Sequence, residues 1–123
     1  EIAQCLVGSE MCIRDRYGPG NDLVSATALT AAGAHMILFS TGRGTPFGAP
    51  APTLKIATNS QLAAKKSTWI DFNAGVVADG EKTLDEAGAD LYQLVLDVAS
   101  GKQTCAEKKG FREISIFKDG VVL

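Results

Sequence analysis

Residues 35–40, His-Met-Ile-Leu-Phe-Ser, form a run of strand length whose centre is wholly apolar. A run of this kind is typical of a strand that is covered on both faces, as strands of parallel sheets are. We therefore expect residues 35–40 to form the central strand of the fold. The chain then becomes irregular at residues 41–48, Thr-Gly-Arg-Gly-Thr-Pro-Phe-Gly, and prolines continue to residue 52.

The segments on either side of this run predict a helix and a second strand. Asn21 or Asp22 can cap a helix over residues 23–32, and Gly33 stands where a left-handed C-terminal cap is expected. Residues 53–58 alternate apolar side chains with Lys55 and Ala57, which predicts a strand with one more polar face.

The second half of the chain predicts further helices. Asn59 and Ser60 can cap a short helix that runs through Lys66, and Thr83 with Glu86 forms a capping box at the start of a helix over residues 84–100. Residues 69–75 are not assigned from their periodicity, and residues 102–110 form a polar stretch. Residues 114–117 predict a short terminal strand or, as the alternative, a helical turn. The order of elements indicates an α/β fold, a mainly parallel, Rossmann-like layered sheet with flanking helices.

Composition limits the chain to one modest domain of 123 residues, 46% hydrophobic and 21% charged. The net charge of -2 argues against a nucleic-acid partner, and no stretch of eighteen apolar residues predicts a membrane span. Three cysteines, an odd number in a chain poor in cysteine, favour a reducing compartment.

The N-terminal segment does not fit the rest of the sequence. Residues 5–16, Cys-Leu-Val-Gly-Ser-Glu-Met-Cys-Ile-Arg-Asp-Arg, have neither helical nor strand periodicity. Residues 6–15 resemble one reading frame of a transposon-end adapter used to prepare sequencing libraries. We expect residues 1–16 to be a non-native segment and residues 17–123 to be the C-terminal domain, a fragment of a longer protein. The alternative is a genuine, irregular N-terminal arm.

The loop at residues 41–48, which contains three glycines, is the strongest candidate for a binding site. Ligands of open α/β sheets bind beyond the carboxyl ends of the strands, where this loop begins. Arg43 offers a planar fork for a carboxylate or phosphate, Thr41 and Thr45 add hydroxyl groups, and Gly42 and Gly44 allow backbone amides to face a ligand. This combination suits a small polyhydroxy acid or a phosphate. A flexible surface loop with a solvated arginine is the alternative.

Other polar side chains are given structural roles. His35 is interpreted as a hydrogen-bonded structural residue, and Asp71 as the cap of a turn or the partner of a cation. Lys65 and Lys66 are expected on a solvated helix face, and Cys105 as an inert thiol. No cluster of His, Asp and Glu has the spacing of metal ligands.

Several motifs together carry a resemblance. They are Pro-Gly-Asn-Asp at 19–22, Gly-Ala-His-Met-Ile-Leu-Phe-Ser-Thr-Gly-Arg-Gly-Thr-Pro-Phe-Gly at 33–48, Lys-Ile-Ala-Thr-Asn-Ser at 55–60, Trp-Ile-Asp-Phe at 69–72, Gly-Lys-Gln-Thr-Cys at 101–105 and Phe-Arg-Glu-Ile-Ser-Ile-Phe-Lys at 111–118. In this order and spacing, residues 18–123 resemble the C-terminal end of the altronate and galactarate dehydratase family.

The resemblance implies a cytoplasmic hydro-lyase that dehydrates D-altronate to 2-dehydro-3-deoxy-D-gluconate in hexuronate catabolism. It also implies a divalent metal, iron or manganese, whose ligands lie outside this stretch, and partners that comprise a sugar acid and upstream domains. We expect the fragment alone to be inactive. Dehydration of galactarate or another sugar acid is the alternative within the family, and a non-catalytic acid-binding or structural domain is the alternative outside it.

The resemblance also suggests which residues meet the substrate. Residues 41–45 (Thr41, Gly42, Arg43, Gly44 and Thr45) would hold its carboxylate or hydroxyl groups, and Asn21, Asp22, Lys55 and Asn59 would add to the walls. No general base and no metal ligand is assigned.

Overall fold

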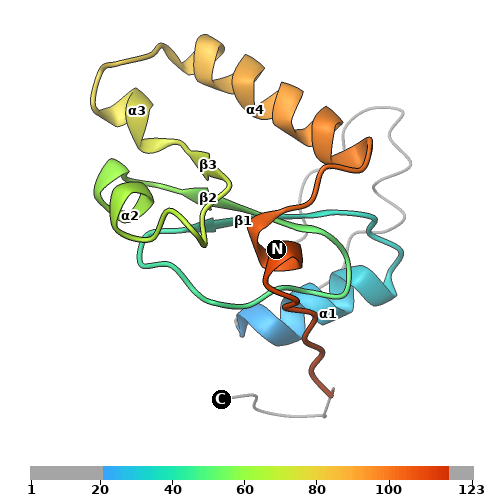
Figure 1. Ribbon diagram of the computed structural model, residues 1–123. Helices are drawn as coiled ribbons and strands as arrows, with labels where there is room; N and C mark the ends of the chain where they lie inside the picture. Colours follow the sequence, from blue (N-terminus) through green and yellow to red (C-terminus); the bar gives the residue numbers. More distant parts are fainter. Residues whose placement is uncertain (1–20, 117–123) are drawn as a thin grey trace, which may run out of the picture.

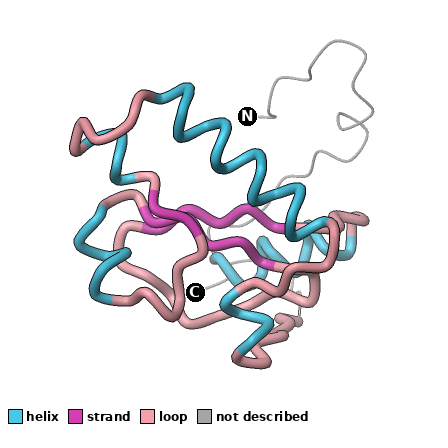
Figure 2. The backbone as a smooth tube through the Cα atoms, turned by 45° about the horizontal axis from the view of Figure 1, so that its top comes forward, coloured by secondary structure: helices cyan, strands magenta, loops and turns pink. Residues whose placement is uncertain are grey.

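The computed structural model describes residues 21–116, and our predictions for residues 1–16 and for Phe117 lie outside this range. The elements follow in the order α1 (Asp22–Ala31), β1 (Ile37–Thr41), β2 (Thr53–Ala57), α2 (Ser60–Lys65), β3 (Phe72–Asn73), α3 (Gly75–Ala78), α4 (Leu84–Ala99) and α5 (Cys105–Lys108). The strands form a parallel sheet, with α4 on one side and α1 on the other (Figures 1 and 2). The predicted α/β class is therefore confirmed.

The strand at the centre of the sheet is β2, with β1 and β3 on either side of it. β1 pairs with β2 from Ile37 opposite Thr53 to Thr41 opposite Ala57. The prediction that the apolar run 35–40 forms the central strand, covered on both faces, is wrong, because β1 lies at an edge and Leu38 is 54% exposed. The strand buried along its length is β2, although it contains Lys55, a residue type that is rarely buried.

The predicted helix starts are confirmed by their caps. Asn21 accepts a hydrogen bond from the amide of Val24, and Asn59 accepts one from the amide of Leu62 at 2.8 Å. These side chains satisfy amides that the first turn of a helix leaves unpaired. Gly33, with φ of 99°, follows α1 in the left-handed conformation that favours glycine.

The core beneath the sheet depends on small side chains in α1. Ala26 of α1 packs with Ile37, Phe47 and the alanines that precede β2. Phe47 also meets Phe39 edge to face, with ring centroids 5.0 Å apart. The loop between β1 and β2 thus contributes its own aromatic anchor to the core, which fixes the loop's far end.

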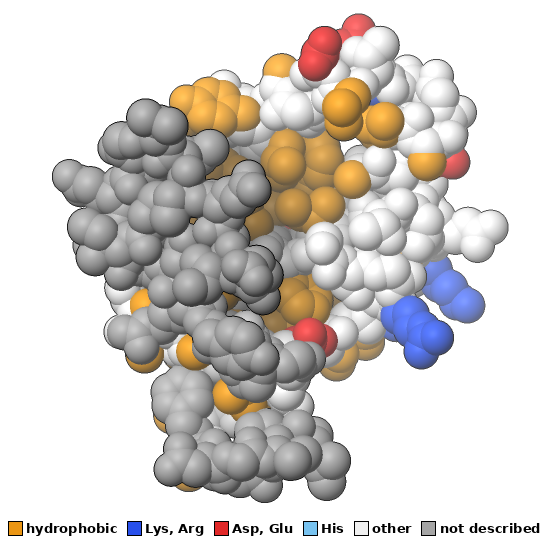
Figure 3. Space-filling model, turned by 180° about the vertical axis from the view of Figure 1, so that it is seen from behind, with side chains coloured by type: hydrophobic (Ala, Val, Ile, Leu, Met, Phe, Trp, Pro, Cys, Tyr) orange, Lys and Arg blue, Asp and Glu red, His pale blue; other side chains and the backbone are white. Residues whose placement is uncertain are grey.

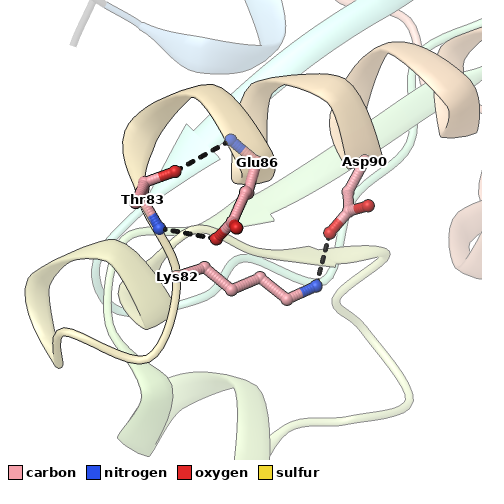
Figure 4. A network of polar contacts seen from close by, with 4 residues as sticks. All are labelled: Lys82, Thr83, Glu86 and Asp90. Carbon is pink, nitrogen blue, oxygen red and sulfur yellow. Dashed lines mark hydrogen bonds and ion pairs between the residues drawn. The ribbon is translucent and has the colours of Figure 1, made fainter.

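Helix α4 has the predicted boundaries, but several of its large apolar side chains are exposed. Thr83 and Glu86 form the predicted capping box, and Lys82 pairs with Asp90 on the same side of the helix (Figure 4). Among the apolar residues of α4, Val98 is buried, whereas Leu84 is 75% exposed. Within the described part of the chain, no helix is long and apolar enough to cross a membrane.

The C-terminal part differs from the prediction. Residues 114–116 form neither a strand nor a helical turn, so both alternatives fail over the described residues. The stretch of residues 102–110, for which we predicted only polar character, contains the short helix α5. A second capping box, formed by Thr104 and Glu107, starts this helix. Asp71 joins this helix to the sheet by accepting hydrogen bonds from the amides of Lys55 at 2.9 Å and Cys105 at 2.7 Å. The structural role predicted for Asp71 is confirmed.

Candidate functional site

The loop of residues 42–45 begins where β1 ends and lies beside the end of β2. The amide of Thr58, just after β2, donates to the carbonyl of Thr41 at 3.1 Å. The loop therefore occupies the carboxyl edge of the parallel sheet, the edge at which α/β proteins bind ligands.

Four consecutive carbonyls of this loop accept hydrogen bonds from side chains elsewhere in the chain. Asn59 Nδ2 donates to Gly42 O at 3.1 Å, and Lys66 Nζ donates to Arg43 O at 2.8 Å and to Gly44 O at 3.5 Å. Lys55 Nζ donates to Thr45 O. The backbone is therefore held from 42 to 45, which argues against the flexibility in the alternative prediction, whereas the Arg43 side chain is exposed to solvent as that alternative has it.

Two amides of the loop are also engaged. Thr41 Oγ1 accepts from the amide of Gly44 at 2.9 Å and from that of Arg43 at 3.4 Å. Gly44 has φ of 80°, and a Cβ there would lie 3.0 Å from side-chain carbons of Leu62 and Lys66. Glycine is thus required at 44 by the backbone conformation and the close approach of α2.

A shallow pocket of 290 Å³ lies between this loop and α2. Its lining residues are Gly42, Arg43, Asn59, Gln61, Leu62, Lys65 and Lys66. Seen from behind, lysine and arginine side chains gather at the side of the molecule that α2 occupies (Figure 3). Among the described residues, neither Arg43 nor Lys65 pairs with a carboxylate, so the pocket presents unneutralised positive charge.

Of the nine residues predicted for the site, the structure brings Gly42, Arg43 and Asn59 together in this pocket. Thr41 ends β1 and accepts hydrogen bonds from the loop amides, while Gly44 and Thr45 belong to the loop; none of the three lines the pocket. Asn21 and Asp22 lie at the start of α1 and do not line the pocket.

Lys55 lies beneath the loop, not in the pocket wall. Its side chain is 1% exposed, with Nζ 5.4 Å from the centre of the Phe47 ring. Burial disfavours the charged ammonium and lowers the pKa of Lys55, although Asp71 acts in the opposite direction. The predicted polar face of β2 therefore faces the protein interior, and Lys55 supports Thr45 from inside.

Lys66 is not the solvated side chain that we predicted. Besides its bonds to the loop, its Nζ lies 4.8 Å from the centre of the Trp69 ring, and Lys109 Nζ lies 5.5 Å from the same ring. Gln61, Leu62, Lys65 and Lys66 were all missed as pocket residues. A signal existed for two of them, because Asn59, Leu62 and Lys66 have the spacing of one helix face.

The remaining candidates lie apart from the pocket. His35 is exposed before β1. Burial raises the pKa of the Cys105 thiol, and nearby Asp71 adds to the effect, which agrees with an unreactive cysteine. An apolar cleft of 430 Å³ lies between the β3–α3 segment and α4, and its lining includes Phe72, Val77 and Leu91.

The described residues do not fit the divalent metal that the resemblance implies. Residues 21–116 contain no group of three or more His, Cys, Asp or Glu side chains able to hold a metal ion. A metal site needs several such donors. We therefore derive no chemical step through a metal from this part of the chain.

The comparison with protein families decides where the chain belongs. Residues 9–122 match the model of the D-galactarate/altronate dehydratase C-terminal domain. The chain belongs to this family. It is 55% identical over 105 residues to altronate dehydratase of Escherichia coli and 48% identical to that of Bacillus subtilis. Over 107 residues it is 40% identical to galactarate dehydratase (L-threo-forming) of Escherichia coli.

The matches cover only part of each relative. They span 85% of this chain in all three cases, but 21% of the two altronate dehydratases and 20% of the galactarate dehydratase. The chain thus corresponds to about a fifth of the length of these relatives.

Proposed function

We propose that the pocket between the loop and α2 binds the carboxylate of a sugar acid for a dehydratase of this family. The observation that carries the proposal is the unneutralised positive charge of Arg43 and Lys65 at the carboxyl edge of a parallel sheet. Family membership supplies the class of ligand. The substrate that we propose is D-altronate, converted to 2-dehydro-3-deoxy-D-gluconate in the hexuronate catabolism of the cytoplasm.

The reaction explains why cations are needed. A base removes the proton from the carbon next to the carboxylate, and the electron pair of that C–H bond forms a carbon–carbon double bond. The neighbouring hydroxyl takes up a proton from a general acid as its C–O bond breaks, and it leaves as water. The resulting enol then rearranges to the 2-keto acid. Negative charge builds up on the carboxylate oxygens when the proton leaves, and a fixed guanidinium stabilises that charge more than the charge of the resting carboxylate.

Arg43 is suited to this role because its backbone is held while its side chain is exposed. The loop carbonyl of Arg43 is bonded to Lys66, and its amide is bonded to Thr41. A guanidinium can hold both carboxylate oxygens with two parallel hydrogen bonds. Asn59 and Gln61 lie in the same pocket and offer amide groups to the hydroxyls of the substrate.

Steady-state kinetics of the full-length protein that contains this sequence would test the proposal. We expect Arg43→Ala to lower kcat/KM for D-altronate by about 100-fold, as the loss of one charge-stabilising donor does. Arg112→Ala, which removes an exposed arginine outside the pocket, is the matched control and should leave kcat/KM unchanged. Near-normal kinetics of Arg43→Ala would overturn the proposal.

Galactarate should be assayed in parallel, because one of the relatives carries that substrate in its name. A higher kcat/KM for galactarate would keep the carboxylate-binding role of Arg43 and correct the substrate.

A further inference from the structure

We infer that Lys66 is a positioning residue that fixes Arg43 for the substrate carboxylate. The inference rests on the proposed function and adds to it the residue that controls the geometry of the pocket. Lys66 is the C-cap of α2, and its ammonium reaches the carbonyls of Arg43 and Gly44. The residue that carries the guanidinium is thereby tied to a helix 23 positions away in the sequence.

The contacts around Lys66 leave its side chain little freedom. Its Cδ lies so close to Gly44 that a Cβ built on the glycine would be 3.0 Å away. Its Nζ lies over the Trp69 ring at 4.8 Å, and the Trp69 amide donates to the Lys66 carbonyl at 2.9 Å. A lysine whose methylene chain is packed and whose ammonium is hydrogen-bonded can hold the loop in one position, unlike a solvated lysine.

The opposite end of α2 holds the same loop. Asn59 caps the helix with its Oδ1, which accepts from Leu62 N, while its Nδ2 donates to the carbonyl of Gly42. Consecutive carbonyls from 42 to 44 are therefore bonded to the two ends of one short helix. Arg43 is between these two supports, and its carbonyl is the one that Lys66 binds at the shorter distance.

Lys66 also lines the pocket, so a direct contact with the ligand must be distinguished from an effect through Arg43. A double-mutant cycle separates the two cases. If Lys66 acts only by placing Arg43, its replacement has no further effect once the Arg43 guanidinium is gone. If Lys66 binds the ligand itself, the two losses of affinity multiply.

The experiment is a chemical-shift titration of the 123-residue chain with D-altronate and with D-galactarate. The proteins are the wild type, Arg43→Ala, Lys66→Met, Lys66→Arg, the double variant Arg43→Ala/Lys66→Met and the control Lys102→Met, which removes an exposed lysine elsewhere. We expect Arg43→Ala to raise Kd by about 10- to 100-fold and Lys66→Met by about 3- to 10-fold. The double variant should match Arg43→Ala, Lys66→Arg should recover most of the affinity, and Lys102→Met should bind like the wild type.

A Kd of Lys66→Met equal to that of the wild type would overturn the inference. A double variant whose Kd exceeds that of Arg43→Ala by the full factor measured for Lys66→Met would also overturn it. Thermal unfolding of each variant shows that the comparison is made between folded proteins.

Backbone relaxation of residues 42–45 tests the inference without any ligand. Lys66→Met should make the Arg43 and Gly44 amides more mobile on the nanosecond scale, whereas Lys102→Met should not. Unchanged relaxation overturns the positioning role even if neither acid binds. If neither acid binds the wild-type chain and relaxation changes as expected, Lys66 positions the loop, and carboxylate binding by this part of the protein is what fails.

Discussion

The loop of residues 42–45 and helix α4 are held in opposite ways. The side chains that bond the loop carbonyls lie 10, 17, 22 and 23 positions away in the sequence. The side-chain bonds of α4 join residues 3, 4 or 8 positions apart, as its capping box and the Lys82–Asp90 pair show (Figure 4). Local bonds shape a helix without fixing its place, whereas long-range bonds fix a loop in the fold.

Exposure follows the same division. Leu84, Tyr92 and Leu96 of α4 are 75%, 64% and 42% exposed, while Lys55 under the loop is 1% exposed. The region of the candidate site is thus the better anchored of the two. A binding site needs this anchoring, because its groups must already be in position when the ligand arrives.

A pair of glycine substitutions, at Gly48 three residues after the loop and at Gly88 in α4, should give the largest difference in stability. A Cβ at Gly48 would lie 2.4 Å from the carbonyl oxygen of Phe111, so Gly48→Ala should lower the free energy of unfolding by about 1–3 kcal/mol. A Cβ at Gly88 in α4 meets nothing within 4 Å, and Gly88→Ala should raise it by about 0.5–1 kcal/mol through helix propensity. Urea unfolding of both variants measures the difference, and equal effects would break the comparison.

The two capping boxes offer a more closely matched pair. Thr104 starts α5 and is 1% exposed, whereas Thr83 starts α4 and is exposed. Loss of a threonine cap costs about 0.5–2 kcal/mol. We expect the cost of Thr104→Ala to lie at the upper end of this range, because the Glu107 amide that loses its acceptor is shielded from water. The cost of Thr83→Ala should lie at the lower end. Reversed magnitudes in thermal unfolding would show that α4 is the better anchored helix.

The pH dependence of stability should reveal the buried lysine. Burial holds the pKa of folded Lys55 below the ordinary 10.5, so the unfolded chain binds more protons between the two values. The free energy of unfolding then rises with pH in that window through this residue. We expect the wild type to gain stability relative to Lys55→Met as the pH rises toward 10.5, the ordinary pKa of a lysine. A constant difference would mean that Lys55 titrates normally and is solvated.

The smallest effect is expected at the exposed ion pair of α4. Lys82 and Asp90 have side chains that are 48% and 50% exposed, and such pairs contribute little to stability because water and salt screen them. Lys82→Met should leave the Tm within experimental scatter at both low and high salt. A clear, salt-dependent loss of Tm would show that α4 depends on this pair for its position.

The features that the sequence predicted correctly are the local ones. Asn21, Asn59 and Thr83 cap their helices as expected, because a cap and the amide that it binds lie within three residues of each other. The strand order was missed because the burial of Lys55 depends on a carbonyl ten residues away. Helix α5 has four residues and no apolar periodicity, so its only signal in the sequence is the capping-box spacing of Thr104 and Glu107, which our prediction did not use.

Two of the site residues that the sequence predicts correctly, Gly42 and Arg43, are also neighbours along the chain. The strand-to-loop transition and the arginine between two glycines are visible in the sequence, and they led to Gly42 and Arg43. The contribution of α2 is only partly visible, because the spacing of Asn59, Leu62 and Lys66 indicates a shared helix face but not what that face contacts. Only the tertiary fold shows that Lys66 points back to the loop.

An amide chemical-shift titration of the wild-type chain with D-altronate reports on the loop and on α4 at once. We expect saturable shifts concentrated at residues 42–45 and 59–66, with the amides of α4 unchanged. Shifts confined to α4 and the neighbouring apolar cleft, or no saturable shifts for any sugar acid, would contradict this expectation.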